Sequence, residues 1–98
     1  MSRAPSPAAR GVSRQVVIVN TKGLHARAAA SFVRFADGFA AEVKVESKGQ
    51  TVSGHSIMGL MMLAAAKGTK ITIRATGKDA RAAVDALVRL VAAGFYEE

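Results

Sequence analysis

A histidine and an arginine lie two positions apart where a strand-like run passes into a helical pattern. The segment reads Gly23-Leu24-His25-Ala26-Arg27. A helix start has unpaired backbone N–H groups and the positive end of the helix dipole, and both favour anionic ligands, phosphate above all. The imidazole of His25 can accept a phosphoryl group, and the guanidinium of Arg27 can neutralise the charge that it brings. The pattern therefore predicts phosphoryl chemistry at this helix start.

The bland alternative is that His25 is an N-cap or a surface residue without a function, which is the commoner role of an isolated histidine at such a position. Its neighbours favour the functional interpretation. Gly23 permits tight backbone geometry before the helix, and the apolar Leu24 can anchor the turn in the core.

A second candidate is Ser56, which precedes a short helical segment. Serine is a preferred N-cap, and the helix dipole would also favour a phosphate at this position. The segment is apolar nearly all round, so part of it must stay exposed as an adaptable surface for partners. His55 has no acidic or cysteine companions and is expected to be structural or incidental. No residue pattern predicts a metal or a cofactor.

Hydrophobic periodicity predicts the elements that position these residues. In order they are a strand over 15–20, a helix ending near 37–38, strands over 41–46 and 50–53, a helix from 56 to about 66, a strand over 70–75 and a helix from 78 to about 93. The first strand looks buried on much of both faces, whereas two later strands alternate and predict one buried face. The order βαββαβα predicts an α+β, two-layer open-faced sandwich, in which three helices cover one face of a four-stranded antiparallel sheet.

Size and composition indicate one domain. The 98 residues contain no cysteine, which excludes disulfides and is compatible with a reducing compartment. Residues 1–13 are predicted to be a disordered tail, and residues 14–98 are predicted to form the domain. No apolar run approaches the roughly 20 residues of a membrane span, and no secretory signal is evident, so a cytoplasmic location is expected. The net charge of +7 can steer acidic partners to the surface.

Two other classes of function compete with phosphoryl chemistry. A small RNA-binding domain has a related element order and would suit the positive charge, but it stacks bases on aromatic side chains of the sheet. Here the five aromatic residues fall in or beside the predicted helices. A small regulatory, ferredoxin-like domain without phosphoryl chemistry would leave the histidine–arginine pair unexplained.

Gly23 to Arg27, followed by Ala29-Ala30, resembles the active-site signature of the histidine-containing phosphocarrier protein (HPr) family of the bacterial phosphotransferase system. Residues 56–63 resemble the family's regulatory-serine segment, and residues 67–71 with 75–77 resemble its last strand and exit turn. The resemblance covers roughly residues 14–96, and the C-terminal residues 94–98 resemble the nitrogen-related (NPr) branch. The motifs lie in register over the whole predicted domain.

The resemblance implies a carrier rather than an enzyme with its own turnover. His25 would accept a phosphoryl group on Nδ1 from phosphorylated enzyme I and pass it to an enzyme IIA domain, and Arg27 would pair with the phosphoryl oxygens. Whether such a relay ends at sugar transport or at nitrogen regulation stays open. One departure is Ala28, where the family usually has proline, and it adds an N–H donor to the helix start.

The resemblance also implies a regulatory role for Ser56, as a substrate of HPr kinase/phosphorylase. The residues expected to face partner proteins are Ala30, Ile57, Met58 and Met61. The acidic end, Glu97-Glu98, is expected to be an exposed tail. A monomer is expected, since a carrier must expose its site.

Overall fold

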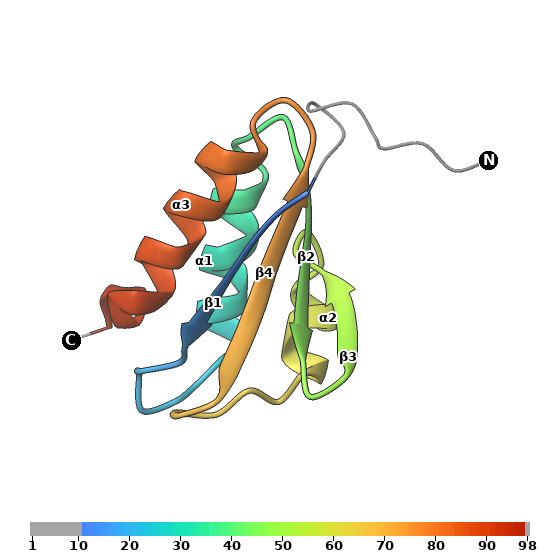
Figure 1. Ribbon diagram of the computed structural model, residues 1–98. Coiled ribbons are helices and arrows are strands. Elements are labelled where there is room, and N and C mark those ends of the chain that lie inside the picture. The colour runs from blue at the N-terminus through green and yellow to red at the C-terminus, as the bar shows by residue number, and fades with distance from the viewer. Residues whose placement is uncertain (1–10, 98) are drawn as a thin grey trace.

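The structure, a computed structural model, describes residues 11–97 (Figure 1). Its elements are β1 (Val12–Val17), α1 (Ala26–Ala36), β2 (Glu42–Ser47), β3 (Gln50–Ser53), α2 (Ile57–Met62), β4 (Lys70–Thr76), α3 (Ala80–Ala92) and the short 3-10 helix η2 (Gly94–Tyr96). The four strands form one sheet in the order β1-β4-β2-β3, and every neighbouring pair is antiparallel. The predicted βαββαβα architecture is confirmed.

The core lies between one face of the sheet and the helices. Along β4, Ile71, Ile73 and Ala75 are buried, while Lys70 and Arg74 point to the open face. This alternation explains why the helices gather on a single side of the sheet (Figure 1). Helix α1 lies between α3 and α2 and packs against both. None of the helices within residues 11–97 is long and apolar enough to cross a bilayer.

The first strand differs from its prediction. Ile18, directly after β1, is fully buried, but Val17 and Val19 are 41% and 45% exposed. The expectation of burial on both faces is wrong, because the helices cover only one side of the sheet and Val17 lies opposite Lys70 on the open side. β1 begins at Val12, so the last two residues of the predicted tail belong to the sheet. Residues 1–10 of that tail lie outside the described residues.

Helix α2 is also shorter than predicted. It ends at Met62 rather than near Ala66, because Ala64 adopts a left-handed backbone conformation with φ 52°. The chain then runs along the turn that precedes α1, where the N–H of Leu24 donates to the carbonyl oxygen of Ala65 at 2.9 Å. The segment after α2 therefore supports the segment that carries His25.

This support requires a glycine at position 23. Gly23 has φ +66°, and a Cβ there would lie 2.5 Å from the carbonyl oxygen of Ala65. We expect Gly23→Ala to lower the free energy of unfolding by about 3 kcal/mol, from backbone strain plus the steric clash. Gly49 offers a matched control, because its φ is +82° but a Cβ would meet no described atom within 4 Å.

Gly49→Ala should therefore cost only the backbone strain, about 1 kcal/mol. Urea denaturation of the two variants and the wild type measures the difference. Equal losses at the two positions would show that the contact between Gly23 and Ala65 does not constrain the loop.

Candidate functional site

The loop before α1 presents His25 at the surface. Gly23 turns the chain, Leu24 is buried in the core as predicted, and His25 becomes the N-cap residue of α1 with an extended backbone. The imidazole does not cap the helix, and its side chain is 26% exposed. Its ring nitrogens are therefore not used to cap the helix, and the imidazole can contact a ligand or a partner.

The first turn of α1 provides backbone donors beside this imidazole. The first backbone bond of the helix runs from the N–H of Ala29 to the carbonyl oxygen of His25 at 2.8 Å. The N–H groups of Ala26, Arg27 and Ala28 precede that bond and have no partner within the helix. Together with the helix dipole, they favour an anion beside His25.

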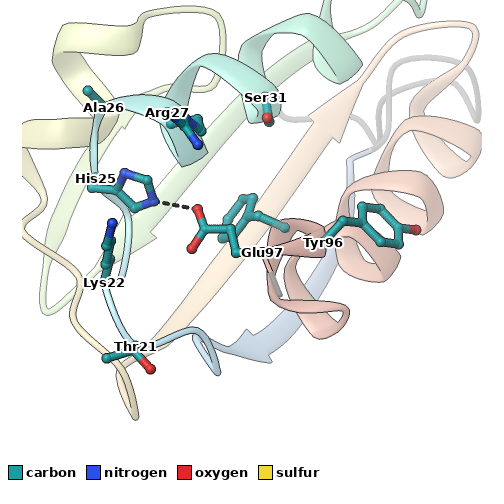
Figure 2. A pocket seen from close by; sticks show the side chains of 9 residues that line it. Thr21, Lys22, His25, Ala26, Arg27, Ser31, Tyr96 and Glu97 are labelled. Atoms are coloured by element: carbon teal, nitrogen blue, oxygen red, sulfur yellow. Dashed lines mark hydrogen bonds and ion pairs between the residues drawn. The ribbon is translucent and has the colours of Figure 1, made fainter.

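A hollow of about 630 Å³ opens in front of the imidazole. Figure 2 shows His25 with Lys22 and Arg27 near it. Arg27 and Lys22 are both exposed, and within residues 11–97 neither forms an ion pair with a carboxylate. Two cationic side chains that line the hollow, with the donors of the helix start, give an arrangement that suits a phosphoryl group. The sequence predicts that His25 and Arg27 lie together, but it predicts no role for Lys22.

Glu97 is the site residue that the sequence analysis missed. Its carboxylate pairs with Nε2 of His25 (Figure 2) and accepts a second hydrogen bond from Nδ2 of Asn20 at 3.1 Å. The side chain is only 21% exposed, so the expectation of an exposed tail is wrong for Glu97; Glu98 lies outside the described residues. Sequence offers no signal for this pair, because the two residues are 72 positions apart.

The surroundings of Glu97 favour its ionised form. Burial of the carboxyl raises its pKa. The hydrogen bonds from His25 and Asn20, and then the electrostatic attraction to His25 and Lys22, lower it by more, so the pKa of Glu97 lies below its usual value. The group next to Nε2 of His25 is therefore a carboxylate, which accepts hydrogen bonds and donates none.

Ser56 and the apolar segment form a separate surface on α2. Ser56 is the N-cap of α2, as predicted, and its Oγ accepts from the N–H of Gly59 at 2.9 Å. Leu60 is the buried residue of the helix. The exposed side chains are Ile57, Met58, Met61 and Met62, at 42%, 71%, 42% and 65%. Met62, which the expected docking set omits, thus belongs to the same exposed patch.

Ala30, on α1, is half-buried. None of the described residues of α2 lines the hollow at His25, but α2 packs against α1. The histidine site and the methionine patch are therefore carried by neighbouring helices.

His55 has a structural environment, in line with its expected role. Its Nε2 accepts from the N–H of Val43 at 3.0 Å, and its Nδ1 lies 2.7 Å from a carboxylate oxygen of Asp37. The ring thus joins β2 to the end of α1. Both ring nitrogens have protein partners, in contrast to Nδ1 of His25, which has none among residues 11–97.

The open face of the sheet does not resemble an RNA-binding surface. It carries charged and small polar side chains, including the ion pair of Arg74 with Glu46 at 2.7 Å. All five aromatic residues lie outside the strands, in α1, in the loop that follows it and in η2. No aromatic platform for bases is present in residues 11–97.

Comparisons with known proteins show the family of this chain. Residues 12–93 match the family model described as "PTS HPr component phosphorylation site". The chain is 43% identical to the phosphocarrier protein HPr of Cupriavidus necator over 86 residues, which cover 88% of this chain and 97% of that protein. It is also 43% identical to the phosphocarrier protein NPr of Shewanella violacea, over 88% of this chain and 94% of that protein.

Among solved structures, the crystal structure of HPr-C-His from Thermoanaerobacter tengcongensis is similar to this fold. The TM-score is 0.85 at 39% sequence identity, and the match covers 89% of this chain and 98% of that one. The likeness therefore extends over nearly the whole described chain.

Proposed function

Because the chain belongs to the HPr family of phosphotransferase-system phosphocarriers, we propose that His25 is the residue that carries its phosphoryl group. The family makes this protein a phosphoryl carrier rather than an enzyme, with enzyme I and enzyme IIA as its partners. The observation that carries the assignment to His25 is the position of its imidazole. It faces the hollow lined by Lys22 and Arg27, at the uncapped start of α1.

The proposed transfer needs few groups. The lone pair of Nδ1 of His25 attacks the phosphorus of phosphohistidine in enzyme I, and the bond from phosphorus to the donor's nitrogen breaks as the donor imidazole leaves with the electron pair. The N–H groups of Ala26 and Arg27, with the guanidinium of Arg27, stabilise the phosphoryl oxygens. The reverse chemistry delivers the group to a histidine of enzyme IIA. Ala28 adds an N–H that proline would lack.

Incubation with phosphoenolpyruvate, enzyme I and an enzyme IIA domain tests the function as a whole. Intact-mass measurement should find one acid-labile phosphate on the protein, and addition of enzyme IIA should remove it and label the acceptor. A protein that gains no phosphate, or that gains one and cannot pass it on, would contradict the assignment.

The exposed patch on α2 is the proposed docking surface for both partners. Ile57, Met58 and Met61, with Ala30 beside them, supply flexible apolar area that can repack against different proteins, and we add Met62 to this set. Such a surface is what we expect of a cytoplasmic monomer that carries phosphoryl groups for either sugar transport or nitrogen regulation. The chain is equally similar to an HPr and to an NPr protein, so the identities support the two branches equally.

Regulation at Ser56 is the second part of the proposal. Phosphorylation by HPr kinase/phosphorylase would place negative charge at the start of α2, among residues that we expect to dock enzyme I. Treatment with that kinase should add an acid-stable phosphate to the wild type and none to Ser56→Ala. The variant should also lose about 1 kcal/mol of stability with its N-cap.

Ser53→Ala is the matched control, because the Oγ of Ser53 also accepts one backbone N–H, from His55 at 3.0 Å. It should be phosphorylated like the wild type. An acid-stable phosphate that persists in Ser56→Ala would remove the regulatory role of Ser56.

A further inference from the structure

The chain after α3 is held in an unusual conformation next to the site. Gly94, Phe95 and Tyr96 have φ values of 66°, 59° and 58°, so three successive residues are left-handed. Only glycine adopts this conformation freely, and other residues keep it only where the surroundings fix them. Phe95 is 6% exposed and packs in the core, and the N–H of Glu97 donates to the carbonyl oxygen of Gly94 at 3.1 Å. The turn therefore aims Glu97 back toward the start of α1.

Glu97 contacts the loop that carries His25 at two points. One carboxylate oxygen pairs with Nε2 of His25, and the other accepts from Nδ2 of Asn20 at 3.1 Å. The same Nδ2 donates to the carbonyl oxygen of Gly23 at 2.8 Å. Asn20 thus joins the C-terminal turn to the turn before α1, while the side chain of Tyr96 points away from His25 (Figure 2). Two contacts therefore fix the position of the carboxylate within the site.

The protonation of the imidazole follows from this contact. A carboxylate cannot donate, so Nε2 of His25 must carry the proton that joins the two groups. A neutral imidazole has one protonated nitrogen and one with a free lone pair, and the hydrogen bond made by one nitrogen determines the state of the other. With the proton on Nε2, the lone pair is on Nδ1, which has no partner within residues 11–97 and which is the atom proposed to attack phosphorus.

We propose that Glu97 is a positioning residue for phosphoryl transfer, which holds the proton on Nε2 of His25 and so presents Nδ1 as the nucleophile. The inference rests on the proposed function and adds a residue to it. When Nδ1 forms its bond to phosphorus, the ring becomes a cation that keeps its Nε2 proton, and the carboxylate stabilises that cation. When the group leaves for enzyme IIA, the ring takes back the electron pair and returns to the same neutral tautomer, so no proton needs to be exchanged with water.

The test measures the tautomer and the rate on the same proteins. Two-bond 1H–15N spectra of 15N-histidine-labelled protein, at a pH where imidazole is neutral, report which nitrogen of His25 is protonated. Rapid-quench experiments with phosphorylated enzyme I report the transfer rate. We expect the Nε2–H tautomer to dominate in the wild type, a mixture of tautomers in Glu97→Ala, and a transfer rate about tenfold lower in that variant.

Two further variants separate the hydrogen bond from charge alone. Glu97→Gln keeps an acceptor oxygen and loses the charge, so it should retain the Nε2–H tautomer with a smaller loss of rate. Glu42→Gln makes the same charge change on the exposed start of β2 and should match the wild type in both measurements. An unchanged tautomer population in Glu97→Ala would overturn the inference, whatever the rate. Phosphate carried at a residue other than His25 would instead overturn the proposed function itself.

Discussion

Replacing His25 with alanine is expected to abolish phosphorylation by phosphoenolpyruvate and enzyme I. The imidazole of His25 lines the hollow, and its Nδ1 has no partner among residues 11–97, whereas the N–H groups and cations around it can stabilise a phosphoryl group but cannot form a bond to phosphorus. Intact-mass measurement should therefore find no acid-labile phosphate on His25→Ala. The substitution removes a partly exposed ring that does not cap the helix, so we expect the variant to fold like the wild type.

The other histidine supplies the control. His55 bonds to Val43 and Asp37 through its two ring nitrogens, so it has no free nucleophilic nitrogen. His55→Gln should be phosphorylated like the wild type, once circular dichroism shows that it is folded. Equal labelling of His25→Ala and the wild type would place the acceptor elsewhere in the chain.

Replacing Arg27 with alanine is expected to slow transfer from enzyme I by about 100-fold, the usual effect of removing one well-placed donor to a developing charge. Arg27 lines the hollow and forms no ion pair within residues 11–97, so its guanidinium is available to an incoming phosphoryl group. Arg27→Lys should recover part of the rate, because lysine keeps the charge but lacks the planar fork of donors. Rapid-quench kinetics measure all three proteins.

Arg34→Ala is the matched control, because it removes the same charge from the same helix. Arg34 lies in the last turn of α1, where its guanidinium contacts Ser31 at 3.4 Å, and it does not line the hollow. The transfer rate of this variant should lie within about twofold of the wild-type rate, because an exposed charge that does not contact the phosphoryl group has a weak effect. A similar loss in Arg34→Ala and Arg27→Ala would assign the effect to overall charge rather than to the site.

The sequence predicts those parts of the fold that depend on local pattern. The alternation of β4 and the helical spacing of α3 each reflect one buried face, and they could be recognised without knowing what lies opposite. The exposure of Val17 and Val19 could not be predicted in this way. It depends on the helices covering only one face of the sheet, which is a property of the whole fold and not of the strand.

The candidate site also has a part that could be predicted from local pattern and a part that could not. His25 and Arg27 are neighbours in the chain, so their common position at a helix start could be predicted. Glu97 reaches His25 from 72 positions away, through a turn whose two non-glycine residues adopt a conformation that sequence propensities disfavour. The packing of Phe95 in the core and the contacts of Glu97 with His25 and Asn20 hold that turn, and long-range contacts of this kind are not visible in a local pattern.

The most direct test of the account is the position of the phosphate on the phosphorylated protein. Phosphorus and nitrogen NMR of protein labelled with 15N-histidine and charged by phosphoenolpyruvate and enzyme I identifies the nitrogen that is bonded to phosphorus. We expect a single phosphohistidine, with phosphorus coupled to Nδ1 of His25 and a proton retained on Nε2. Phosphorus bonded to Nε2, or to His55, would contradict it.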